Sequence, residues 1–191
     1  MLARVLTVLL LPVTFAYAAA DLYDYKVLAT TKTSTMEKEL NEASAQGFRI
    51  EKAMGGESAF GGSEVIVIMS KERSAAAKGR FAYKLLATNK TSTMQKELNE
   101  AGNEGFEYRD QTVFSSAFGG KEVVAILELD RDANPKVRYE YRLLATSKTS
   151  TMQKELLEAG ADGFKFVGVT VSKTAFGGNE VVSIMRKDIP Q

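Results

Sequence analysis

The feature that most constrains the fold of this chain is a unit that occurs three times in tandem. The copies begin at Tyr25, Tyr83 and Tyr141, and they align without a gap at a spacing of 58 residues. Over the 48 positions of the unit, 23 are identical in all three copies. A fixed period of this length is typical of tandem structural repeats. The sequence therefore predicts one small structure built three times.

The identical positions are not spread evenly over the unit. The strings KTSTM and AFGG are present in every copy, whereas the ten residues that precede Ala59 (Arg49–Ser58) contain no position identical in all three copies. Some positions have therefore tolerated change and others have not.

Each unit is predicted to have the order β-α-β-β. Apolar and polar residues alternate around Tyr25, which indicates a strand, and a helix is expected from about Thr35 to Gln46. The variable stretch is then a second strand, AFGG is the loop of a hairpin, and Val65–Met69 is the third strand. Gly47 is placed where a left-handed residue would end the helix.

The start of each helix is predicted to be a capping box. Ser34 and Glu37 have the spacing in which a serine hydroxyl and an acidic or amide side chain satisfy free amides of the first turn. The corresponding pairs in the other copies are Ser92 with Gln95 and Ser150 with Gln153.

The third strand is apolar on both faces, which is typical of a central strand. We therefore predict an α+β fold in which each repeat is a three-stranded antiparallel sheet of order 1-3-2 with one helix on one face. Leu28, Leu86 and Leu144 are expected on the face away from the helix. Because about 50 residues form a marginal core alone, the repeats are expected to pack on one another.

The chain divides into a leader, three repeats and two short linkers. The expected bounds are 1–20 for a signal peptide, 21–72, 81–130 and 139–191 for the repeats, and 73–80 and 131–138 for the linkers.

The first twenty residues have the pattern of a secretory signal peptide. Arg4 precedes an apolar run from Val5 to Phe15, and small residues then offer cleavage before Ala19 or Asp21. A retained membrane anchor is the alternative, but the run is shorter than the roughly 20 residues that span a bilayer. We expect a periplasmic or secreted protein that has no membrane contact after cleavage.

Composition excludes several classes of function. The chain has no His and no Cys, which argues against the usual zinc, haem, copper and iron–sulfur sites and against His- or Cys-dependent catalysis. Removing the leader takes away one basic residue, Arg4, and leaves 24 basic and 24 acidic residues. That balance argues against nucleic acid as a partner. We expect no cofactor and no metal.

The strings "YDYKVLAT", "YEYRLLAT" and "KELNEAGNEGFEY" resemble a small bacterial family known only as domain of unknown function 4177. The resemblance covers about the first thirty residues of each unit and implies a fold without an activity. The chain differs from the family in the KTSTM and AFGG strings, and in having Phe48, Phe106 and Phe164 where the family usually has Trp.

In the predicted topology, KTSTM at the helix start and AFGG in the hairpin converge on the same end of each unit. Helix amides, a lysine and a glycine pair are suited to an anionic or polar ligand. The candidate ligand-binding residues are Lys32, Thr33, Ser34, Phe60, Gly61, Gly62, Lys90, Thr91, Ser92, Phe118, Gly119, Gly120, Lys148, Thr149, Ser150, Phe176, Gly177 and Gly178.

Three other interpretations of these strings stay open. Ser34 could serve only to cap its helix while Phe60 packs on the core, or the phenylalanines could form contacts between repeats or between chains. A hydrolase with Lys32 and Ser34 as a nucleophile pair is the third, although the sequence supplies no orienting group. We expect a non-enzymatic binding or assembly module with a protein partner or self-association.

Overall fold

The computed structural model describes residues 22–57, 63–74, 79–88, 90–115, 121–134, 136–173 and 179–190. Within them each repeat forms the predicted β-α-β-β unit. The first repeat contains β1 (Tyr23–Thr30), α1 (Thr33–Ala45), β2 (Arg49–Glu57) and β3 (Ser63–Glu72). The second contains β4 (Phe81–Thr88), α2 (Thr91–Asn103), β5 (Glu107–Ser115) and β6 (Lys121–Asp130). The third contains β7 (Val137–Thr146), α3 (Thr149–Ala161), β8 (Lys165–Lys173) and β9 (Asn179–Pro190).

Each repeat contributes one three-stranded antiparallel sheet. The strand orders are β1-β3-β2, β4-β6-β5 and β7-β9-β8, so the predicted fold class and the order 1-3-2 are confirmed. The central strand β6 of the second repeat packs on both sides, with Ala125 and Leu127 in one core cluster and Val124 and Ile126 in another. Val67 and Met69 of β3 face α1, whereas Ile66 and Ile68 face away from it.

The predicted direction of Leu28 is wrong. Leu28 lies opposite Val67 across the β1–β3 pair and packs into the same core cluster as Met36 and Leu40 of α1. Leu86 and Leu144 likewise pack with the helices of their own repeats. Alternation along a strand defines two faces, but when both faces carry apolar residues it does not show which one the helix covers.

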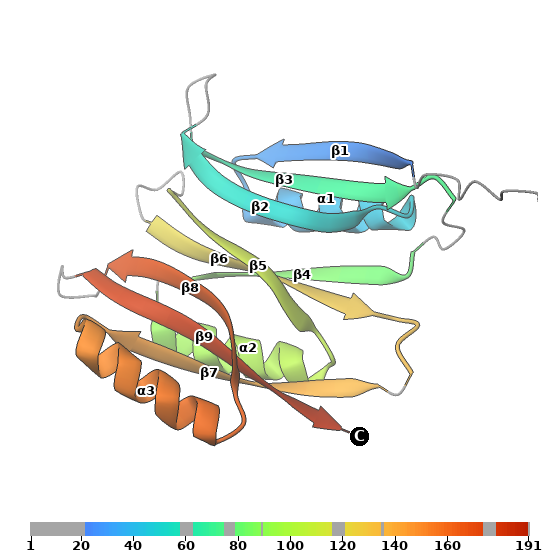
Figure 1. Cartoon of the computed structure of the whole chain (residues 1–191). Helices are drawn as coiled ribbons and strands as arrows, with labels where there is room; N and C mark the ends of the chain where they lie inside the picture. The colour runs from blue at the N-terminus through green and yellow to red at the C-terminus, as the bar shows by residue number, and fades with distance from the viewer. Residues whose placement is uncertain are drawn as a thin grey trace, which may run out of the picture.

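The first helix is shared between two sheets. One core cluster joins Leu40 of α1 to Val67 of the first sheet, and also to Tyr83 and Ile126 of the second sheet. Figure 1 shows α1 lying between these two sheets. The expectation that the repeats pack on one another is therefore confirmed: α1 lies against the first sheet and along the edge of β4, and β2 packs directly on β5.

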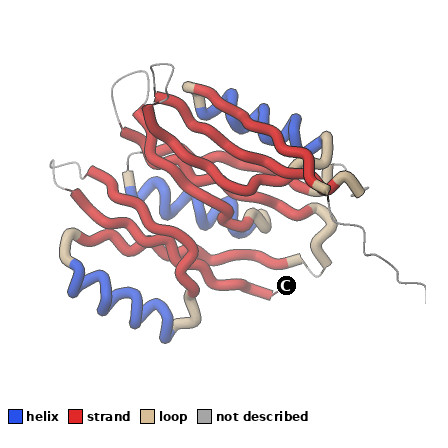
Figure 2. Tube along the Cα trace, turned by 45° about the horizontal axis from the view of Figure 1, so that its top comes forward, coloured by secondary structure: helices blue, strands red, loops and turns tan. Residues whose placement is uncertain are grey.

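The second junction repeats this arrangement, and the third helix ends it. α2 joins Leu98 and Leu127 of the second repeat to Tyr141 and Ile184 of the third in one cluster. α3 packs on the third sheet, where Ala159, Phe164 and Met185 are buried. The sheets also meet directly beside the helices, because β5 contacts both β2 and β8. Figure 2 shows each helix against a sheet.

The predicted helix ends are confirmed at one glycine in each repeat. Gly47, Gly105 and Gly163 follow α1, α2 and α3 with φ of 93°, 92° and 87°. This left-handed conformation is readily available only to glycine, so it ends each helix in the same way.

Candidate functional site

At the first repeat junction, a helix lies along the open edge of a strand. The side-chain amide of Asn41 donates to the Tyr83 carbonyl oxygen at 2.9 Å, and its oxygen accepts from the Tyr83 N–H at 2.9 Å. One turn earlier, a Glu37 carboxylate oxygen accepts from the Leu85 N–H at 2.8 Å. Because β4 pairs with β6 only on its other side, these bonds satisfy backbone groups that an edge strand would leave open.

The second junction has the same chemistry. The Gln95 side chain donates to the Tyr141 carbonyl oxygen at 2.7 Å and accepts from the Leu143 N–H at 2.7 Å. The Asn99 side-chain oxygen accepts from the Tyr141 N–H at 2.8 Å. In α1 and α2, a carboxylate or amide side chain and, one turn later, an asparagine thus form hydrogen bonds with the backbone edge of the next repeat's first strand.

A third contact sits at the carboxyl end of each shared helix. The Ser44 hydroxyl of α1 donates to the Phe81 carbonyl oxygen at 2.6 Å. The equivalent residue of α2 is Gly102, where a Cβ atom would overlap the Tyr139 carbonyl oxygen. A small residue at this position lets the helix approach the strand closely.

A buried tyrosine completes each junction. The Tyr83 hydroxyl accepts from the Ile50 N–H at 3.0 Å and donates to Glu128 at 2.9 Å. The Tyr141 hydroxyl accepts from the Tyr108 N–H at 2.7 Å. Burial is the main cause that raises the pKa of both tyrosines, because it disfavours the phenolate.

Each junction also holds an ion pair, and its sign is reversed between the two. In the first, Arg49 lies 2.8 Å from the buried Glu128, and this hydrogen bond raises the pKa of the Arg49 guanidinium. In the second, Glu107 replaces Arg49 and pairs with Arg186, which replaces Glu128. The charges differ, but opposite signs meet in both.

The predicted capping boxes are wrong. α1 begins at Thr33, its N-cap residue is Lys32, and no side chain caps it, so Ser34 lies inside the first turn. The Lys32 N–H donates to the Thr30 hydroxyl at 3.2 Å. Glu37 and its counterpart Gln95 bind the next repeat instead. The sequence has the spacing of a capping box, but the side chains of Glu37 and Gln95 bond to the backbone of the next repeat and not to their own helix.

The predicted ligand-binding residues of the KTSTM strings lie at the three helix starts, mostly on the surface. Lys32, Lys90, Lys148, Ser34, Ser92, Ser150 and Thr149 are exposed, and Thr33 and Thr91 are half-buried. Among the described residues, no hydrogen bond joins the Lys32 side chain to Ser34, the pair that a Ser–Lys nucleophile would need. The nine residues do not form one repeated site, because their surroundings differ.

At the first helix start, acidic residues surround the candidate site. Thr33 and Ser34 line a depression together with Glu37 and Glu97. One Glu97 carboxylate oxygen is buried and has no partner among the described residues. The negative charge of two carboxylates beside the helix amides opposes the binding of an anion there.

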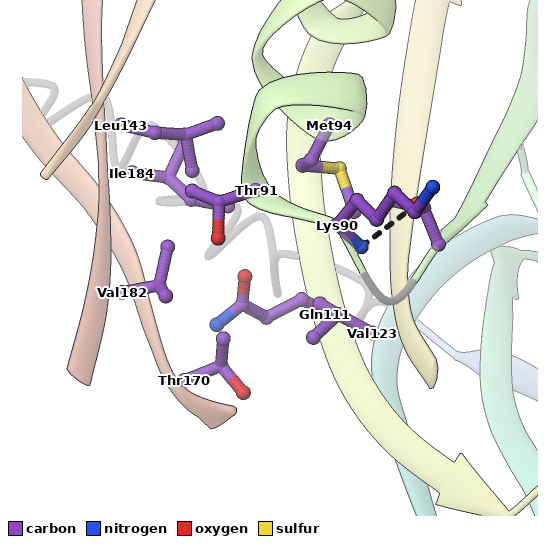
Figure 3. A pocket seen from close by; sticks show the side chains of 10 residues that line it. Lys90, Thr91, Met94, Gln111, Val123, Leu143, Thr170, Val182 and Ile184 are labelled. Atoms are coloured by element: carbon purple, nitrogen blue, oxygen red, sulfur yellow. Dashed lines mark hydrogen bonds between the residues drawn. The ribbon is translucent and has the colours of Figure 1, made fainter. Parts of the chain in front are cut away.

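At the second helix start, Lys90 and Thr91 line a small cavity between the second and third repeats. Its volume is about 20 Å³, which is room for one water molecule. The Gln111 side chain points into this space toward Thr170, and neither its oxygen nor its nitrogen has a partner among the described residues (Figure 3). The cavity is too small for an organic ligand.

The other half of the candidate site lies outside the described residues. This half comprises Phe60, Gly61, Gly62, Phe118, Gly119, Gly120, Phe176, Gly177 and Gly178. The strands that flank the first AFGG string do end where α1 begins, since Thr30 pairs with Val65 and Glu57 pairs with Ser63. The expected signal peptide 1–20 also lies outside these residues.

Two apolar surfaces at the ends of the stack are the feature that sequence reasoning missed. We call the outer side of the first sheet, with Tyr25, Val27, Met54 and Ile68, the amino-terminal face. We call the outer side of α3 and β8 the carboxy-terminal face; it exposes Leu157, Phe166, Val169 and Val171. Every large hydrophobic residue that is exposed within the described residues belongs to the first or third repeat, and none to the second.

Equivalent positions show why these faces are open. Tyr25 is 68% exposed, whereas Tyr83 and Tyr141 are 3% and 2% exposed. Ile68 is 43% exposed, whereas its equivalent Ile126 is fully buried. The 58-residue alignment could have pointed to these faces, because a stacked repeat has neighbours on both sides only in the middle of the chain.

Comparison with models of known protein families, with curated proteins and with solved structures gave no match. The resemblance to domain family 4177 therefore stays a prediction from the residues of the first strand and helix.

Two further properties concern membranes and metals. In the described parts of the chain, α1, α2 and α3 are each too short and too polar to cross a bilayer. The same parts contain no cluster of acidic side chains arranged to hold a metal ion.

Proposed function

We propose that this chain is an exported, non-enzymatic binding or assembly module whose two terminal faces are its binding surfaces. The observation that carries the proposal is the contrast between Tyr25, which is 68% exposed, and the equivalent Tyr83 and Tyr141, which are buried in the junctions. Stacked repeat proteins ordinarily carry polar outer faces on their terminal repeats. Apolar faces in that position mark surfaces that bind another molecule.

The backbone edge supports the same proposal. β1 pairs with β3 on one side, and its other edge corresponds to the edges of β4 and β7 that α1 and α2 cover. An apolar face beside an open strand edge is suited to a protein partner, because the edge can bind side-chain amides or another backbone.

The alternative function, binding of a small anionic or polar ligand at the helix starts, has weaker support. The three starts have different surroundings, and Glu37 and Glu97 lie beside the first one. The exposed side chains of Lys32, Lys90 and Lys148 are the observation that still supports anion binding at the helix starts.

Site-specific photocrosslinking in the producing cell tests the proposal. A benzoyl-phenylalanine would replace Val27 on the amino-terminal face, Leu157 on the carboxy-terminal face, or Lys96 on the solvent side of α2 as the matched control. We expect protein adducts from Val27 and Leu157 and none from Lys96. If neither terminal face yields an adduct, the proposed function is wrong.

A further inference from the structure

We propose that the partner is a second copy of this chain, whose carboxy-terminal face docks on the amino-terminal face of the first. This inference rests on the proposed function and deepens it by naming the partner. The contact would be the third occurrence of a junction that the chain already forms twice within itself. Its two halves are the surfaces that the stack leaves open, the first sheet at one end and α3 with β8 at the other.

The apolar residues of the two faces occupy positions that pack together at the internal junctions. Tyr25 and Ile68 correspond to Tyr83 and Ile126, which share a core cluster with residues of the preceding repeat. On the other face, Phe166 corresponds to Ile50, a member of that same cluster. Docking therefore buries Tyr25 and Ile68 of one copy against Phe166 of the other.

The polar contacts are also available. Gln153 of α3 has the position of Gln95, so it can donate to the Tyr25 carbonyl oxygen and accept from the Val27 N–H of the second copy. Gly160 has the position of Gly102, and a Cβ atom there meets no neighbour within 4 Å, so the space for a strand is open. The Tyr25 hydroxyl can accept from the Phe166 N–H, as the Tyr83 hydroxyl accepts from Ile50.

Charge at the edge of the junction is complementary as well. Lys165 has the position that Arg49 and Glu107 occupy at the internal junctions. Opposite it, Ser70 has the position of Glu128 and donates to the Glu51 carboxylate. A lysine therefore meets a carboxylate, so opposite charges meet at the third junction as they do at the two internal ones.

One residue makes this contact weaker than the internal junctions. Leu157 replaces the asparagine found at Asn41 and Asn99, so the Tyr25 N–H of the docked copy has no amide acceptor. An unsatisfied buried amide lowers the affinity, and the association is therefore reversible. Because two different surfaces meet, the contact is head to tail. An assembly of any length therefore has one open amino-terminal face at one end and one open carboxy-terminal face at the other.

The test uses two variants that each block one face. Val27→Lys places a charge on the amino-terminal face and Leu157→Lys places one on the carboxy-terminal face; both residues are more than 60% exposed, so folding is preserved. Analytical ultracentrifugation of the chain from Asp21 to Gln191 measures mass against concentration. We expect the parent to form assemblies that grow with concentration, each variant alone to stay monomeric, and an equimolar mixture to form a 1:1 dimer and nothing larger.

The other outcomes contradict the inference. A parent that stays monomeric at all concentrations overturns self-association, while adducts to other proteins at Val27 would then leave the proposed function standing. Dimers that survive Leu157→Lys but not Val27→Lys mean that two amino-terminal faces pair with each other, which overturns the head-to-tail contact.

A substitution that strengthens self-association tests whether α3 of one copy lies along β1 of the next. Leu157→Asn restores the missing amide and should lower the dissociation constant about tenfold, because one satisfied buried amide has roughly that value. Gly160→Leu should raise the dissociation constant, since its large side chain would meet the docked strand, where the internal junctions have only Ser44 and Gly102. A Leu157→Asn variant with unchanged or weaker association means that α3 does not lie along the β1 edge.

Discussion

Two glycines at equivalent positions have opposite roles. Gly102 of α2 lies where the chain of the next repeat passes, so a methyl group would overlap the Tyr139 carbonyl oxygen, whereas Gly160 of α3 faces open space. We expect Gly102→Ala to lower the free energy of unfolding by more than about 1 kcal/mol, because backbone atoms must move. Gly160→Ala should raise it by about 0.5–1 kcal/mol through better helix propensity. Urea unfolding of the dilute monomer measures both.

The buried tyrosines make stability depend on pH in alkaline solution. Burial raises the pKa of Tyr83 and Tyr141 in the folded state above the unfolded value of about 10, so the folded chain binds more protons than the unfolded chain above that pH. The contribution of these two tyrosines to stability is therefore constant below about pH 10 and falls above it, by about 1.4 kcal/mol per pH unit for each tyrosine.

Urea unfolding from pH 8 to 11 measures this slope. Tyr83→Phe should make the slope shallower. Tyr25→Phe, at the equivalent position but with an exposed ring, is the matched control. Equal slopes in all three proteins would show that Tyr83 is not buried as the junction requires.

At the scale of elements, the contact that organises the fold is a helix along the edge of a neighbouring strand. Asn41→Leu gives α1 the residue that α3 has, and it leaves the N–H and carbonyl of Tyr83 without partners. We expect a loss of about 2 kcal/mol in the free energy of unfolding. Leu157→Asn is the matched control, and in the dilute monomer it should change stability by less than about 0.5 kcal/mol. Similar losses from both substitutions would contradict the role of Asn41.

The elements themselves could be predicted from the sequence, but their partners could not. Three aligned copies fixed the order β-α-β-β, and a third strand apolar on both sides placed β3 in the centre of its sheet. The direction of Leu28 and the role of Glu37 were both wrong. Alternation along the first strand does not show which of its two apolar faces the helix covers, and spacing within one repeat carries no information about the β4 edge that Glu37 binds.

The candidate site stays a prediction, because half of its residues lie outside the described residues. The identity of the KTSTM strings in all three copies suggested a shared ligand, yet Thr33 and Thr91 have different surroundings and Thr149 is exposed. Identity between repeats is also expected from the shared local structure of a strand end and a helix start. The difference on which our proposal of self-association depends, Leu157 in place of Asn41 and Asn99, is at a position where the copies disagree.

At the scale of the whole molecule, no repeat has a complete core alone. The first core cluster includes Tyr83, Val124 and Ile126 from the second repeat. A chain of residues 21–74 exposes the sides of α1 that these residues cover, so we expect it to be unfolded or oligomeric by circular dichroism and sedimentation. The parent should unfold in one transition. A monomeric single repeat with a cooperative transition would mean that the junctions are not needed for folding.

Amide hydrogen exchange followed by NMR tests the central claim most directly, because it measures the edge of each first strand. In the dilute protein we expect the N–H groups of Tyr83 and Tyr141, which donate to the side-chain oxygens of Asn41 and Asn99, to exchange slowly although they point out of three-stranded sheets. The Tyr25 N–H should exchange fast, and it should become protected at concentrations where copies associate. If Tyr83 and Tyr141 exchange as fast as Tyr25 in the dilute protein, the helices do not cover the strand edges and the account is wrong.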